Sequence, residues 1–216
     1  MIAILFAIFL VQAGAGSPPD LTGVYDAVPN GTVLPGALKN TPETLNDVPL
    51  QPAAVAEAKK QDLKLDPANL CQAIGPFRMM ASEDNRIELL PWQGRITMLF
   101  ENASLGNMRT IYLTRSHPAK FEELLWNGDA VGHWEGDTLV IDTIGFNDRT
   151  WLNDMGAPHS EALHLTERVR PILGGAYLEY RVTADDPKAL TKPFTYVRYY
   201  KKSNIEMNEY ICREKL

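Results

Sequence analysis

From Cys71 onward, the chain is a succession of short β-rich runs bounded by turn residues. Three links between these runs, Gln93-Gly94, Gly136-Asp137 and Leu173-Gly174-Gly175, have the length and glycine content of hairpin turns. Strands joined by such short turns pair antiparallel. The runs that we expect to form strands are Phe77–Ala81, Ile87–Trp92, Arg95–Glu101, Met108–Thr114, Ala130–Glu135, Thr138–Ile144, Ala162–Ile172, Ala176–Ala184, Phe194–Lys201 and Asn208–Lys215.

The run Ala176–Ala184 alternates as a two-sided strand does, with Leu178, Tyr180 and Val182 on one face and Glu179, Arg181 and Thr183 on the other. We therefore predict a mainly β fold, an antiparallel meander that closes into a lipocalin-like barrel, because closure removes the exposed edge strands. A two-sheet β-sandwich of the same strands is the alternative, since periodicity does not distinguish closure from stacking.

The residues before this region have a different composition. Residues 17–70 are rich in Pro, Asn and Asp, and we expect them to form an irregular arm that wraps the β-barrel-like domain of residues 71–216. Within this arm, Leu21–Tyr25 resembles a short strand and Ala53–Gln61 a short helix.

Two connections are longer than hairpin turns. Ser116–Asp129 contains a short helix candidate, Lys120–Trp126, and Asn147–Glu161 carries polar groups around Trp151. Loops of this length on a compact β scaffold are usually functional or disordered, and the tryptophan favours packed order.

The first 16 residues have the character of a signal peptide. Ile2–Val11 is apolar, and Ala13 and Ala15 then have the spacing of a signal-peptidase site, although no Lys or Arg precedes the apolar run. The run is shorter than the roughly 20 residues that a membrane-spanning helix needs. We expect a secreted or periplasmic protein without stable membrane insertion after removal of the signal.

The sequence contains two cysteines, Cys71 and Cys212. In an oxidising compartment we expect them to form one disulfide. Neither belongs to a Cys-x-x-Cys motif, which disfavours a redox or zinc-ribbon role.

The formal net charge of −6 and the pI near 5.3 provide no basic face for nucleic acid. The partner that we expect is therefore a small-molecule substrate or ligand, and the sequence leaves the oligomeric state open. We predict no metal site and no cofactor, because there is no H-E-x-x-H helix and no cysteine-rich cluster.

Several segments carry specific motifs. These are GHWEGDTLVIDTIGF at 132–146, PHSEALHLTER at 158–168, and Asp186-Pro187 followed by Thr191-Lys192-Pro193. They resemble a large group of uncharacterised secreted bacterial proteins, which also have cysteines at the positions of Cys71 and Cys212. Where that group has D-G-R before His-Pro, this chain has Thr114-Arg115-Ser116. The group implies no particular activity. A shorter similarity, Leu21–Tyr25, is to the opening strand of lipocalin-like barrels.

Histidines and carboxylates suggest acid–base chemistry, because imidazole exchanges protons near neutral pH and a carboxylate can orient it. The catalytic candidates are His159, His164, Glu135, Asp142 and Glu167. Alternation places Glu167 on the mainly apolar face of its strand, where we expect either an ion pair with an arginine such as Arg181 or Arg198, or a base with a raised pKa.

A second set of residues could line a pocket. These ligand-binding candidates are His117, His133, Trp134, Trp151, Tyr180 and Tyr196. The aromatic members could equally be part of the core.

The sequence leaves three functions open. The first is an exported enzyme that uses a His/carboxylate pocket for hydrolysis, elimination or isomerisation of a small molecule. The second is a lipocalin-like protein that binds an apolar small molecule in the barrel. The third is a structural protein of the cell envelope.

Overall fold

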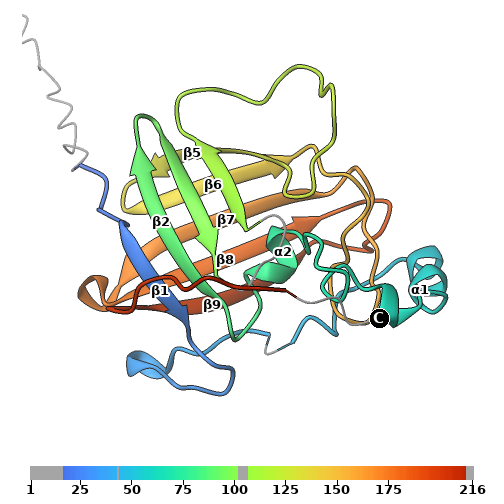
Figure 1. Cartoon of the computed structure of the whole chain (residues 1–216), viewed down its shortest axis with the longest axis horizontal. Coiled ribbons are helices and arrows are strands. Elements are labelled where there is room, and N and C mark those ends of the chain that lie inside the picture. The colour runs from blue at the N-terminus through green and yellow to red at the C-terminus, as the bar shows by residue number, and fades with distance from the viewer. Residues whose placement is uncertain (1–16, 43, 102–106, 213–216) are drawn as a thin grey trace, which may run out of the picture.

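The computed structural model describes residues 17–42, 44–101 and 107–212, so the expected signal peptide at 1–16 lies outside the described residues. These ranges form a closed barrel of nine strands (Figure 1). The strands are β1 Gly23–Ala27, β2 Arg86–Trp92, β3 Arg95–Phe100, β4 Met108–Tyr112, β5 Asp129–Glu135, β6 Thr138–Ile144, β7 His164–Ile172, β8 Tyr177–Asp185 and β9 Phe194–Lys202. The predicted barrel is confirmed, and the sandwich alternative is wrong.

Neighbouring strands follow the chain order, and β1 pairs with β9 to close the barrel. All pairs are antiparallel except β4 and β5, which are parallel over Ile111–Ala130 and Tyr112–Val131. The prediction of a wholly antiparallel meander is therefore wrong at this pair. A parallel pair needs a long crossover, and residues 113–128 supply it.

Two of the expected strands are not strands. Phe77–Ala81 falls largely in the short helix α2, Pro76–Met79, where proline occupies the first helical position. Residues 208–212 have no regular structure, and the rest of the predicted strand Asn208–Lys215 lies outside the described residues. The helix expected at Lys120–Trp126 is also absent, because residues 119–127 form bends and an isolated bridge.

The arm contributes to the barrel. Its first strand, β1, lies between β2 and β9, and its helix α1, Pro52–Ala58, matches the one expected at Ala53–Gln61. Three short 3-10 turns complete the regular structure of the described residues: η1 Pro35–Ala37, η2 Leu63–Leu65 and η3 Leu173–Gly175.

Helix α2 packs against side chains that point into the barrel. Phe77 makes an edge contact with the ring of Tyr196, whose hydroxyl donates to the Phe77 carbonyl. The hydroxyl of Tyr200 donates to the carbonyl of Met80, just after α2. Both tyrosines are fully buried. The barrel interior is therefore filled by side chains next to α2.

A disulfide joins Cys71 to Cys212, as predicted. Four residues before Cys212, the backbone N–H of Asn208 donates to the Glu101 carboxylate at 2.9 Å. Arg86, the first residue of β2, also donates to the carbonyl of Glu206, so the segment after β9 is held beside the start of β2 and the end of β3. Among the described residues, no helix is long and apolar enough to cross a membrane.

Candidate acid–base site

Two histidines share one carboxylate on the outer face of the barrel. Asp142 points outward from β6 and accepts from His117 Nε2 at 2.9 Å through one oxygen and from His164 Nε2 through the other. His164 is the first residue of β7, and His117 lies in the crossover after β4. Since β6 and β7 are neighbours, their register places Asp142 opposite Thr166, and His164 lies two residues from Thr166 on the same face of β7.

The chain of contacts extends beyond His117. Its other ring nitrogen, Nδ1, is 2.7 Å from an oxygen of Asp129, the first residue of β5. Arg115 forms a two-bond ion pair with the same carboxylate and stacks on the ring of Tyr112 at 3.8 Å. The sequence Arg115–Asp129–His117–Asp142–His164 is called the relay below.

Ionised carboxylates stabilise the relay. Burial raises the pKa of Asp142, but the hydrogen bonds from His164 and His117 outweigh it, so the pKa lies below its ordinary value. Burial likewise raises the pKa of Asp129, and its bonds to Arg115 and His117 reverse the shift. Both carboxylates are therefore acceptors near neutral pH.

The relay ends in an accessible imidazole. The side chain of His164 is 44 % exposed, whereas that of His117 is 16 % exposed. Because Asp142 only accepts, His164 Nε2 carries the proton, and in the neutral ring Nδ1 keeps its lone pair. Within the described part of the chain, Nδ1 of His164 has no hydrogen-bond partner. An imidazole of this kind can act as a general base.

Two surface pockets flank the relay. One is a shallow groove lined by Leu113–His117 and Val131–His133. The other, of about 330 Å³, lies at the β4–β5 junction and is lined mainly by Met108–Thr110, Tyr112 and Leu125–Ala130. Arg115 lines both pockets. A small molecule in the groove would lie beside Arg115 and His117, and one in the second pocket beside Arg115 and Asp129, whereas His164 lines neither of the two.

His159 lies in a different environment. It is buried, its Nε2 is 2.6 Å from the hydroxyl of Thr150, and its Nδ1 is 3.0 Å from the carbonyl of Ser160. The carbonyl requires Nδ1 to donate, so Nε2 accepts from Thr150. Trp151, which follows Thr150 in the chain, is buried and forms an isolated bridge with Pro158, the residue before His159. None of the contacts of His159 joins it to His164.

Burial of His159 predicts a pH dependence of stability. Desolvation lowers the pKa of His159 below its ordinary value near 6.5, although contacts with Ser160 and Asp186 oppose the shift. Below about pH 6.5 the unfolded chain binds a proton that the folded chain excludes, so the free energy of unfolding decreases as pH falls from 6.5 towards the folded pKa. Urea unfolding between pH 5 and 8 measures this decrease, and His159→Gln is expected to reduce the slope. An unchanged slope in the variant would contradict the burial of a neutral His159.

Glu167 points into the barrel and is fully buried. It pairs with Arg109 through two bonds of 2.9 and 2.7 Å and accepts from the hydroxyl of Tyr180 at 2.6 Å. The expected ion pair is present, but its arginine is neither Arg181, which is exposed on the outer face, nor Arg198, which bonds to the carbonyls of Ala81 and Pro42.

The remaining candidates lie apart from the relay. Glu135 pairs with Arg168 at 2.8 Å and with His133 at 3.2 Å on the outer surface. Trp134 packs against the core from the inner face of β5. Tyr180 and Tyr196 are fully buried, and their hydroxyls bond to Glu167 and Phe77. Of the predicted set, the structure thus brings His117, Asp142 and His164 together in the relay, and it separately pairs Glu135 with His133 and Glu167 with Tyr180.

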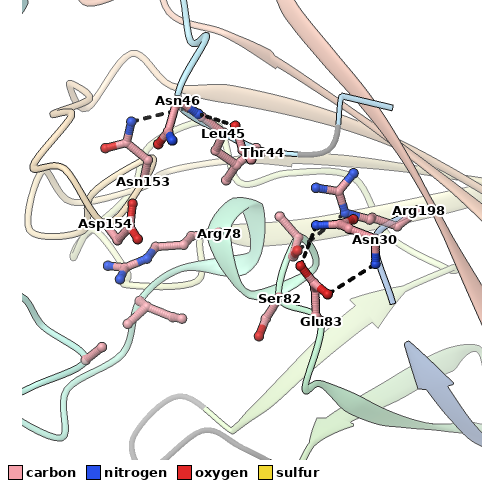
Figure 2. Close-up of a pocket in the computed structure, with 13 residues that line it drawn as sticks. Asn30, Thr44, Leu45, Asn46, Arg78, Ser82, Glu83, Asn153, Asp154 and Arg198 are labelled. Carbon is pink, nitrogen blue, oxygen red and sulfur yellow. Dashed lines mark hydrogen bonds between the residues drawn. The ribbon is translucent and has the colours of Figure 1, made fainter. Parts of the chain in front are cut away.

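A third pocket, of about 440 Å³, lies between the arm, α2 and the loop after β6 (Figure 2). Arg78, Glu83, Asn153 and Arg198 are among the residues that line it. Several of these groups already bond within the protein: Glu83 accepts from the N–H and the side-chain amide of Asn30, and Asn153 donates to the carbonyl of Leu45. The pocket is lined by both polar and apolar side chains.

Within the described ranges, no group of three or more His, Cys, Asp or Glu side chains is arranged to hold a metal ion. No known family model matches the chain, and no curated protein is significantly similar to it in sequence.

Proposed function

We propose that this chain is an exported enzyme that performs metal-free general acid–base chemistry on a small molecule at the relay. The observation that carries the proposal is the bridging of His117 and His164 by the two oxygens of Asp142. A carboxylate that holds an accessible imidazole in one tautomer is the recurring arrangement for proton abstraction. The disulfide supports export, because such bonds persist in oxidising compartments.

In the proposed mechanism, Nδ1 of His164 removes a proton from the substrate or from a water molecule. Asp142 stabilises the imidazolium that forms, as the carboxylates of catalytic triads do. Arg115 holds Asp129, and Asp129 holds His117. His117 in turn fixes the orientation of Asp142. Hydrolysis, elimination and isomerisation all begin with such a proton transfer.

Replacing the terminal base tests the proposal. We expect His164→Ala to lower turnover of a reactive small substrate by about 10² to 10⁴-fold, the usual contribution of a positioned base. The measurement is kcat/KM for a panel of chromogenic esters, lactones and β-hydroxy carbonyl compounds, of which the best substrate is used. Added imidazole is expected to restore part of the activity of His164→Ala.

Two variants make this test specific. Asp142→Asn retains the shape of the side chain but loses the charge that stabilises the imidazolium, so it is expected to lower kcat more than it raises KM. Asp47→Asn, an equally small change at an exposed carboxylate of the arm, is the control and should retain wild-type turnover. Equal turnover by the wild type and His164→Ala would contradict the proposal.

A second function, binding of a small molecule, is favoured by the pocket of Figure 2. Its volume of about 440 Å³ lies in the range of ligand pockets. The lining combines charged and amide groups with apolar side chains such as Leu45 and Ile74, which indicates a ligand with both polar and apolar parts rather than the apolar one expected from the sequence. Native mass spectrometry of protein from its own host would show a copurifying ligand, and Ser82→Trp, which fills the pocket from its rim, would abolish it. If the Ser82→Trp variant still carried the ligand, this pocket would not be the binding site.

A further inference from the structure

Three arginines gather on the outer face of β7 and β8, strands that lie side by side (Figure 1). Arg168 and Arg181 are directly opposite one another in the register, and Arg170 follows two residues along β7. Together with Thr138 and Glu179 they line a pocket of about 160 Å³. This concentration of positive charge contrasts with the net charge of −6 of the whole chain.

The carboxylates around the pocket leave one arginine unpaired. Arg168 donates to Glu135 at 2.8 Å, and Arg170 makes two bonds to Glu179 at 3.1 and 3.2 Å. Within the described residues, the guanidinium of Arg181 makes no hydrogen bond or ion pair, although it is exposed and free to do so. The charge of Asp137, next to the pocket residue Thr138, also acts on Arg170, so the feature that distinguishes the pocket is the unpaired guanidinium of Arg181 and not a net positive charge.

Two like charges directly opposite each other on neighbouring strands destabilise a sheet. An anion between Arg168 and Arg181 would reverse this repulsion. Each guanidinium presents planar pairs of N–H donors that match the oxygens of a carboxylate or phosphate. The pocket has room for about five water molecules at roughly 30 Å³ each, which is enough for one such group.

We propose that the pocket between Arg168 and Arg181 is a binding site for an oxyanion, the carboxylate or phosphate group of a small molecule. The site is separate from the relay. Arg168 follows His164 by four residues on β7, which corresponds to about 13 Å along the strand at about 3.3 Å per residue. Binding can be measured without turnover, so its result does not depend on the proposed enzymatic function.

The test is a titration with inorganic phosphate and, separately, with acetate. Ionic strength is held constant with sodium chloride, and binding is followed through the arginine Nε–H signals in NMR spectra. We expect saturable shifts of the Arg181 signal and an increase in Tm with phosphate or acetate, because a ligand of the folded state stabilises it. The oxyanion that binds more tightly identifies the group as tetrahedral or planar.

Matched variants decide whether the pocket is responsible. Arg181→Gln should weaken binding at least about tenfold, the effect of losing one charged hydrogen bond. Arg95→Gln is the control, since Arg95 is also an exposed strand arginine without a hydrogen bond among the described residues, but lies on β3. Arg181→Lys, which retains the charge without the planar fork, should bind with intermediate affinity. Phosphate and acetate effects no larger than that of chloride, or equal weakening by Arg95→Gln, would overturn the proposal.

Discussion

Replacing Glu167 by alanine is expected to lower the free energy of unfolding by about 3 to 5 kcal/mol, the cost of leaving one partner of a buried ion pair alone. Its partner Arg109 is also buried, and the two side chains are 0 and 2 % exposed. The variant would leave the guanidinium of Arg109 with Thr143 as its remaining side-chain partner. Urea unfolding at pH 7 measures the change.

Two comparisons separate this effect from a loss of packing. Glu135→Ala breaks an exposed ion pair with Arg168 and should lower the free energy of unfolding far less than Glu167→Ala does. The double variant Arg109→Leu/Glu167→Leu removes both charges and should recover much of the lost stability, because apolar pairs often replace buried ion pairs without cost. A cost for Glu167→Ala no larger than that for Glu135→Ala would show that the pair is not buried in solution.

Breaking the disulfide is expected to have an effect of similar size. The bond between Cys71 and Cys212 spans 141 residues, and the chain-entropy model predicts a loss of about 5 kcal/mol when a loop of this length is opened. The Cys71→Ala/Cys212→Ala variant should therefore unfold at a much lower urea concentration than the oxidised protein.

The same experiment has an internal control. Adding a reductant should lower the urea midpoint of the wild type and leave that of the double cysteine variant unchanged. Protein isolated from its host should have no titratable thiol, as the proposed export requires. Equal midpoints for the oxidised and reduced wild type would mean that the bond adds no stability.

The barrel could be predicted because local sequence patterns identify its strands and hairpin turns. The glycine turns at Gly94 and Gly136 fix hairpins between adjacent runs, and alternation in β8 separates the inner from the outer face. The β4–β5 pair could not be predicted in this way. Its parallel direction depends on the path of the crossover at 113–128, which has neither a helix nor a hairpin turn to reveal it.

The strand predicted at Phe77–Ala81 shows how context overrides composition. Its apolar residues suit a buried strand, but Pro76 starts a helical turn and the barrel interior buries the same side chains. A short apolar run does not distinguish these two outcomes.

The site was only partly predictable, because its contacts cross between strands. Asp142 and His164 were predicted catalytic residues, and His117 was predicted to bind ligand. The missed members, Arg115 and Asp129, stand at the two ends of the crossover, and a correct β5–β6 register would have placed Asp129 on the outer face with Asp142. Arg109 was missed as the partner of Glu167 because 58 residues separate them in sequence.

Nuclear magnetic resonance of the imidazole nitrogens can show whether Asp142 bridges His117 and His164 in solution. Long-range ¹H–¹⁵N spectra at a pH where His164 is neutral should show its proton on Nε2. In Asp142→Asn, the signals of both His117 and His164 should shift, whereas those of the buried His159 should not. A proton on Nδ1 of His164, or spectra of the two histidines that Asp142→Asn leaves unchanged, would contradict the relay and the function proposed for it.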